Sequence, residues 1–226
     1  MHAKVKPFPE EQSLAAMRQQ YRHEFISDRY NGHLHLLFTC SVSALLIGVC
    51  AWNLQAVSLL EWLTVPVTFL YANFAEWAGH RFVMHRPVKF LGLVYKRHSL
   101  QHHRFFTDKH MEIDSARDFK AVLFPPVLVS FFLVAFFLPL ALVMNLVFSG
   151  NAALLFTITG MAYFLNYELL HLSYHLKADH WVHRIPGHAT LARLHTTHHD
   201  MRVMAHMNFN ISYPITDWLM RTWDRR

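Results

Sequence analysis

Four long apolar runs constrain the fold of this chain more than any other feature of its sequence. Two of them contain no Lys, Arg, Asp or Glu, one contains only Glu61 and Glu76, and the last is free of charge until Glu168. A helix of about 20 apolar residues crosses the hydrocarbon core of a bilayer. Buried helices of a soluble core are disfavoured, because the runs are long and the chain is 53% hydrophobic. We therefore expect an all-α integral membrane protein with four transmembrane helices, at about residues 33–55, 56–78, 121–147 and 149–170.

The basic residues predict how these helices are oriented. All 21 Lys and Arg lie before residue 30, between residues 81 and 120, or after residue 176. The positive-inside rule then places both termini and the central loop in the cytoplasm, at the inner membrane of a bacterium or the endoplasmic reticulum of a eukaryote. The net charge of +6 reflects this topology and attraction to anionic head groups. No nucleic-acid partner is expected, because the basic residues are spread over several loops.

The rest of the chain is expected to complete a single domain over residues 1–226, since no repeat or low-complexity linker divides it. Residues 79–118 and 169–226 lack alternating β patterns and are expected to form a helical cytoplasmic cap. Residues 1–32 are expected to form an amphipathic cytoplasmic segment, with apolar residues at helical spacing from Leu14 onward. Its helix either lies on the membrane surface or packs on the rest of the domain.

Ten of the 19 histidines form four tight clusters, and every cluster follows the end of an apolar run. Imidazole is the commonest neutral metal ligand and suits iron, zinc and copper. Ten imidazoles are more than one metal ion can use and a suitable number for two. The sequence therefore predicts a dinuclear metal site on one membrane face, with the candidate ligands His80, His85, His98, His102, His103, His171, His175, His195, His198 and His199.

The spacing of these histidines predicts how they are shared between two metal ions. Residues three or four apart share a face of an α-helix, whereas one member of each adjacent pair can serve each metal ion. His80 and His85 are five apart, about 7.5 Å along an α-helix, so we expect them to flank a helix end or to bind different ions. The pairs at a spacing of three or four are His98–His102, His171–His175, His195–His198 and His195–His199, and the adjacent pairs are His102–His103 and His198–His199.

Acidic residues near the clusters are expected to hold the outer ring nitrogens, because a metal-bound imidazole usually donates its second N–H to a carboxylate or a carbonyl. The candidates for this role are Glu76, Asp118, Glu168 and Asp217, with Asp200 nearby. Isolated histidines are expected to be surface or hydrogen-bonded core residues. The role of those between the clusters is left open, and they are His110, His180, His183 and His188.

The clusters resemble those of a known enzyme superfamily in order and spacing. HRFVMH from His80, HSLQHH from His98, HLSYH from His171 and HTTHH from His195 have the spacings HX4H, HX3HH, HX3H and HX2HH. This series resembles the fatty acid hydroxylase (sterol desaturase) superfamily of membrane di-iron enzymes, and most of all the catalytic domain of the fatty acid 2-hydroxylases. The likeness covers roughly residues 70–223, although those enzymes have HX2HH where this chain has HX3HH.

The resemblance implies a centre of two iron ions held by the ten clustered histidines, with zinc able to replace iron in the isolated protein. It implies a membrane lipid as substrate, dioxygen as co-substrate, and hydroxylation of a C–H bond of the lipid. Electrons are expected from a separate ferredoxin or a cytochrome with its reductase, because the 32 residues before the first run are too few for a haem-binding domain.

Two other functions compete with lipid hydroxylation. A lipid or sterol desaturase of the same superfamily shares the metal chemistry, and the sequence does not separate the two. A membrane metal transporter with histidine-rich loops belongs to a different class, but a transporter needs polar ligands within its spans. The apolar runs carry almost none, so the transporter is the less favoured alternative.

Overall fold

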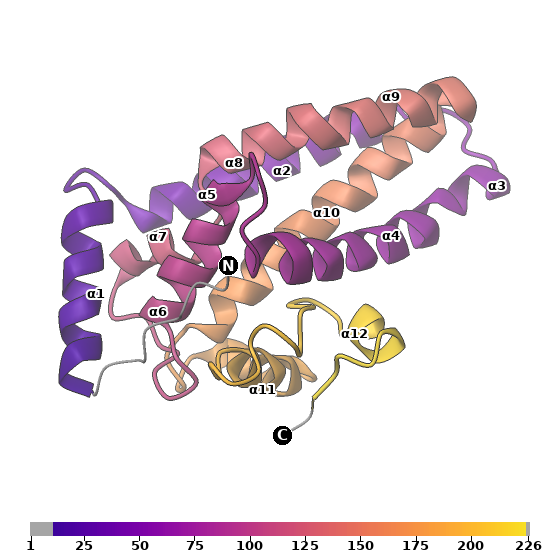
Figure 1. Cartoon of the computed structure of the whole chain (residues 1–226). Coiled ribbons are helices and arrows are strands. Elements are labelled where there is room, and N and C mark those ends of the chain that lie inside the picture. Colours follow the sequence, from indigo (N-terminus) through magenta and orange to yellow (C-terminus); the bar gives the residue numbers. More distant parts are fainter. Residues whose placement is uncertain (1–10, 225–226) are drawn as a thin grey trace.

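A computed structural model describes residues 11–224, and these form a helical protein without strands (Figure 1). Its elements in chain order are α1 (Glu11–Phe25), α2 (Gly32–Trp52), α3 (Leu59–Trp62), α4 (Thr64–Gly79), the π-helical turn η1 (His80–Met84), α5 (Gly92–Tyr95), the π-helical turn η2 (Lys96–His102), α6 (His103–Phe105), the 3-10 turn η3 (Ala116–Asp118), α7 (Phe119–Val122), α8 (Pro126–Phe132), the π-helical turn η4 (Leu133–Phe137), α9 (Leu138–Val147), α10 (Gly150–Tyr174), the 3-10 turn η5 (Trp181–Arg184), α11 (His188–His198) and α12 (Ile215–Leu219).

Three helical stretches of the described chain are long and apolar enough to cross a membrane. They are Gly32–Trp52, Ala116–Val147 and Gly150–Tyr174, and each overlaps a run that the sequence analysis assigned to the membrane. The remaining run corresponds to α4, which has only 16 residues. The all-helical class is thus confirmed, together with three membrane-crossing candidates among the four that were expected.

In the bundle formed by these helices, many large apolar side chains face outward, the reverse of the distribution in a soluble protein. α10 lies centrally and packs against α2, α4 and α9 (Figure 1). On α2 the buried positions include the small polar residues Thr39 and Ser43, while Leu34, Leu45 and Val49 are exposed. Small residues at helix contacts and apolar side chains outside are typical of helices packed in a lipid environment.

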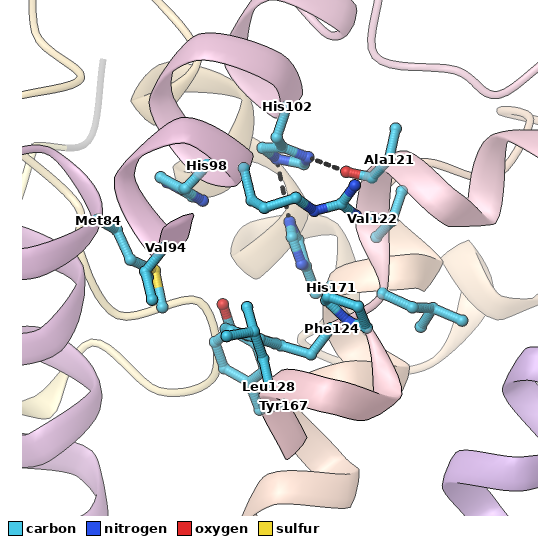
Figure 2. Close-up of a pocket in the computed structure, with 13 residues that line it drawn as sticks. Met84, Val94, His98, His102, Ala121, Val122, Phe124, Leu128, Tyr167 and His171 are labelled. Atoms are coloured by element: carbon cyan, nitrogen blue, oxygen red, sulfur yellow. Dashed lines mark hydrogen bonds between the residues drawn. The ribbon is translucent and has the colours of Figure 1, made fainter. Parts of the chain in front are cut away.

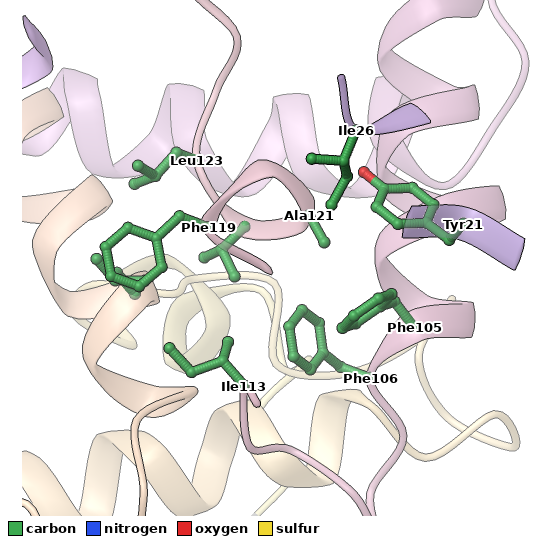
Figure 3. Packing of buried hydrophobic residues seen from close by; sticks show 10 residues of the cluster. Tyr21, Ile26, Phe105, Phe106, Ile113, Phe119, Ala121 and Leu123 are labelled. Atoms are coloured by element: carbon green, nitrogen blue, oxygen red, sulfur yellow. The ribbon is translucent and has the colours of Figure 1, made fainter. Parts of the chain in front are cut away.

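The aromatic core of the molecule lies in the cap, at the end of the bundle remote from α3 (Figures 1 and 3). Phe105 and Phe106 follow the second histidine cluster and are fully buried. The rings of Tyr21 and Phe105 meet edge to face, with centroids 5.2 Å apart. Ile113 and Phe119 belong to the same cluster of buried hydrophobic residues. This core fixes the loops that carry the second histidine cluster.

The N-terminal helix α1 packs on this cap, in the manner of one of the two alternatives given for residues 1–32. Tyr21 is buried, and Arg18 donates hydrogen bonds to the carbonyls of Phe105, His110 and Glu112. Arg22 forms two hydrogen bonds of 2.8 Å with the carboxylate of the fully buried Asp118. Residues 1–10 of the predicted segment lie outside the described residues.

Candidate metal centre

The ten clustered histidines converge on one place, although they come from segments far apart in sequence. The cluster residues lie on η1, on η2 with α6, at the end of α10 and on α11. Within each of two groups, one ligand nitrogen per ring lies within 4.8 Å of every other. The first group is His80, His85, His98, His103 and His198, and the second is His102, His175, His195 and His199. These groups are suited to holding metal ions.

His171 extends the second group. Its Nε2 lies 3.2 Å from Nε2 of His102, and its ring lies 4.9 Å from that of His195 between centroids. The structure therefore places all ten predicted ligands at one centre, five on each side.

π-helical turns bring together the histidines that are five residues apart. His80 and His85 flank the end of a helical segment, as one alternative had it, but they belong to the same group, so the alternative that they bind different ions is wrong. The amide of His85 donates to the carbonyl of His80, a bond between residues five apart that an α-helix does not make. The two rings then stack with centroids 5.0 Å apart in the same group. η2 does the same for His98 and His103, whose Nε2 atoms are 3.0 Å apart.

Two of the pairs expected to act together are instead divided between the groups. His98 and His102 belong to different groups because η2 is wound as a π-helix, and His195 and His198 are divided at the end of α11. The adjacent pairs His102–His103 and His198–His199 contribute one ring to each group, in agreement with the expectation from their spacing.

The outer nitrogens of six rings are held by partners beyond the two groups. A carbonyl accepts only from an N–H, so each such ring carries its proton on Nδ1 and presents an unprotonated Nε2 to the centre. The Nδ1 partners are Phe209 O for His80, Ala121 O for His102 at 2.9 Å, Met111 O for His175 at 2.7 Å, Met207 O for His198 at 2.8 Å, Phe106 O for His199 at 2.9 Å and Ser99 Oγ for His85 at 3.1 Å.

Local backbone chemistry explains one of these acceptors. A helix continuing past α7 would use the carbonyl of Ala121 to accept from the amide of residue 125, but Pro125 has no N–H. The helix stops at Val122, and the carbonyl of Ala121 is free to accept from His102. Ser99 is held similarly, since its hydroxyl donates to the carbonyl of Met84 at 2.7 Å and so accepts from His85.

The convergent nitrogens fit a cation. Nε2 of His102 lies 3.1 Å from Nε2 of His199, and Nε2 of His85 lies 3.0 Å from that of His198. With the protons on Nδ1, both atoms of each pair are acceptors and cannot hydrogen-bond to each other. Their lone pairs repel unless a positive ion lies between them. Neutral imidazole ligands in this number suit a transition-metal ion, and the geometry does not select one such metal over another.

The environment keeps these imidazoles in the neutral form that binds metals. Burial lowers the pKa of His198 to about 4. Burial, followed by repulsion from neighbouring imidazoles, lowers the pKa of His98 and His195 well below the usual value. Both effects disfavour a charged ring.

The four predicted carboxylates make their hydrogen bonds elsewhere, so the expectation that they hold the outer ring nitrogens is corrected. Backbone carbonyls occupy those positions, and the carboxylates hold the backbone segments that carry them. Asp217 accepts from the amides of Phe209 and Asn210, at 3.1 and 2.7 Å. The remaining contacts are Glu76 with the amides of Ile211 and Ser212, Glu168 with the amide of Phe124 at 3.0 Å, and Asp118 with Arg22.

One histidine left open by the sequence has a structural role. His188 is buried, and its Nε2 donates to the hydroxyl of Ser173 at 2.7 Å, since that hydroxyl itself donates to the carbonyl of Leu170. His188 is in neither metal-binding group. His110, His180 and His183 are likewise outside both groups.

An apolar groove between α4 and α9, with α10 as its floor, leads toward the centre. A distal cavity of about 530 Å³ begins near Leu60 and Phe148. A proximal cavity of about 330 Å³ shares Thr68 and Leu140 with it and ends at His80. The two cavities are therefore neighbours along the bundle.

A much smaller space lies directly against the histidines, and we call it the chamber (Figure 2). His98, His102 and His171 line it, so it faces rings of both groups. Its volume is about 30 Å³. Since a water molecule needs roughly 10–15 Å³ measured in this way, the chamber admits one or two groups of that size. Sequence patterns gave no indication of it, because apolar residues lining a cavity look the same as those filling a core.

Comparisons of the chain with models of protein families, with curated proteins and with solved structures find no match. The reading of the centre therefore rests on its own geometry.

Proposed function

We propose that this protein is a membrane oxygenase of the di-iron type, which hydroxylates a C–H bond of a lipid with dioxygen and external electrons. The observation that carries the proposal is the convergence of ten neutral imidazoles beside a small chamber at the end of an apolar groove. The histidine spacing supports the same class, through its resemblance to the fatty acid hydroxylase superfamily.

The two histidine groups would each hold one iron ion. When bound, the ions supply the redox chemistry that activates dioxygen and breaks an unactivated C–H bond. One oxygen atom enters the lipid and the other leaves as water, with the uptake of two electrons and two protons. The electrons come from a separate ferredoxin or a cytochrome with its reductase. An acidic donor of this kind would dock on the basic residues of the cap.

The protein's own residues orient the ligands and exclude water. The carbonyls of Ala121, Phe106 and Met207 fix which nitrogen of His102, His199 and His198 faces the centre. Full burial of nearly all the rings keeps bulk solvent away from the reacting atoms. The apolar groove aligns the lipid, so that entropy is lost on binding and not during the reaction.

The proposed topology has four spans, the second at about residues 56–78 and formed by α3 and α4. α4 alone is about 24 Å long, and α3 extends it toward the roughly 30 Å of the hydrocarbon core. Both termini and the metal centre then lie on the cytoplasmic side, and a lipid enters the groove sideways from the bilayer.

The decisive experiment compares the lipids of cells that express the chain with those of cells that express His198→Ala, under isotopically heavy dioxygen. We expect the intact chain, supplied with a reductase system, to produce a lipid with one heavy oxygen atom that the variant does not produce. Loss of two hydrogens without the label indicates a desaturase instead. An unchanged lipidome, despite bound iron and a competent electron donor, contradicts both and favours metal transport.

A further inference from the structure

Three side chains form the boundary between the proximal cavity and the chamber. Met84, Phe124 and Tyr167 line both spaces (Figure 2), and the rings of Phe124 and Tyr167 lie with centroids 6.0 Å apart. They come from η1, from the extended segment before Pro125 and from α10. We call these three residues the boundary ring.

The boundary ring is held in place by the same elements that build the centre. The amide of Phe124 donates to Glu168 at 3.0 Å, and its carbonyl accepts from Nε2 of His35 at 3.1 Å. The ring of Tyr167 packs against that of His171, with centroids 5.8 Å apart. On the side of Phe124 and Tyr167, the position of the boundary is therefore tied to the segment before Pro125 and to α10.

The volumes on the two sides differ about tenfold, at about 330 Å³ for the proximal cavity and about 30 Å³ for the chamber. A long hydrocarbon fills the first space and presents only one or two of its carbons in the second. A rigid fused-ring system is too wide to place its body in the chamber, whereas an extended chain passes one methylene at a time.

We infer that Met84, Phe124 and Tyr167 determine substrate specificity, admitting a single unbranched acyl chain to the chamber against His98, His102 and His171 and excluding sterols from it. This inference rests on the proposed function, which it narrows from lipids in general to acyl-chain lipids. The boundary ring also determines which stretch of the chain stands against the centre.

The test uses photoreactive probes on the full-length, zinc-loaded protein in lipid nanodiscs, so that binding is read without turnover. One probe is a saturated fatty acid carrying a diazirine, and the other is a sterol carrying a diazirine. We expect the fatty acid to label the peptides that contain Phe124 and Tyr167, in competition with unlabelled fatty acid. Labelling of these peptides by the sterol probe, or by neither probe, overturns the inference.

Substitutions in the boundary ring give the sharper result. Met84→Trp is expected to reduce fatty acid labelling by about tenfold or more, the penalty for misfitting a methylene-sized group in an apolar pocket. Phe124→Ala is expected to admit the sterol probe. Phe90→Ala is the matched aromatic control, because Phe90 is 92% exposed and lines none of the three cavities, and it should retain the wild-type pattern.

Unchanged labelling in both ring variants, with folding verified by retained zinc, contradicts the inference even if the protein is an oxygenase. Fatty acid labelling in the expected pattern without any oxygenated product contradicts the proposed function and leaves the specificity of the boundary ring standing. The two failures are therefore distinguishable.

Discussion

Each histidine of an adjacent pair belongs to a different group, and this division can be tested by counting metal ions. His198→Ala removes a ring from the first group and His199→Ala one from the second. We expect each variant to lose about half of the tightly bound metal of the intact protein, as measured by elemental mass spectrometry. His23→Ala, on the exposed face of α1, should keep the full amount. Full metal content in both group variants would falsify the assignment.

The hydroxyl of Ser99 is expected to tune the first group without touching a metal ion. Ser99→Ala removes the acceptor for Nδ1 of His85 and so frees the ring to turn. Loss of such an outer partner typically weakens metal affinity by about 10–100-fold. Competition with a chelator measures the change. Ser173→Ala is the matched control, because its hydroxyl binds His188, outside both groups; an equal loss of affinity there argues against a specific role for Ser99.

The sequence was sufficient to predict the ten converging histidines but not the atoms that hold them. Clustering of several histidines at helical spacing is a strong signal for residues such as His171 and His195, because isolated histidines show no such pattern. Backbone carbonyls are present at every residue, so nothing in the sequence distinguishes Met207 or Phe209 as an acceptor. Pro125 is the exception, because a missing amide frees a predictable carbonyl.

At the scale of elements, the close approach of α2 to the cap makes one glycine irreplaceable. A Cβ added to Gly32 would lie 1.8 Å from the carbonyl oxygen of Ala116. We expect Gly32→Ala to destabilise the protein by about 1–3 kcal/mol, the usual range for overpacking. Gly48→Ala, on the same helix with open space around it, is the control. Thermal unfolding in detergent compares them, and equal melting temperatures would contradict the predicted contact.

The ion pair between Arg22 of α1 and Asp118 of the cap is expected to contribute to the stability of the folded protein by an amount similar to the effect at Gly32. Arg22→Ala leaves the fully buried carboxylate of Asp118 without its guanidinium partner. Removing one partner of a buried pair costs about 3–5 kcal/mol, and the partial exposure of Arg22 places this case at or below the lower end. Protease sensitivity of α1 reports the loss. Gln19→Ala, exposed on the same helix, should behave as the wild type; if Arg22→Ala does so too, the pair does not anchor α1.

Helix type explains where element-level reasoning from the sequence failed. The apolar runs predicted α2, α9 and α10 because length and composition alone define a spanning helix. A π-helical turn has no comparable signature, so the five-residue spacing of His80 and His85 was judged on α-helical geometry, which left it open whether they flank a helix end or bind different ions. The π-helix adds a residue to the turn and aligns them. The spacing of two residues predicts whether they share a helix face only when the helix type, α or π, is known.

At the scale of the whole molecule, metal binding should dominate stability. Ten imidazoles gathered in one place gain their attraction only when cations are present, and a ligand that binds only the folded state raises its stability. Removing the metal with a chelator is expected to lower the melting temperature, and adding it back should restore it. A melting temperature that is indifferent to the chelator would contradict the proposed centre.

The proposed topology makes a separate prediction. In a variant with Cys40→Ala and Cys50→Ala, an added Gln55→Cys should react with an impermeant thiol reagent applied on the side opposite the cytoplasm. Lys109→Cys, exposed in the cap, should react only after the membrane is opened. Both positions labelled from the same side would contradict the four-span arrangement.

The carbonyls of Met207 and Phe209 orient His198 and His80, so a segment that is translated after all ten clustered histidines completes the positioning of two of them. A growing chain still attached to the ribosome lacks these contacts until its C-terminal region has been synthesised and returned to the bundle. We therefore expect the proposed centre to be loaded with metal only after this segment has been translated and has packed against the bundle. Chains shortened to end before Met207 are expected to reach the membrane without binding the full amount of metal.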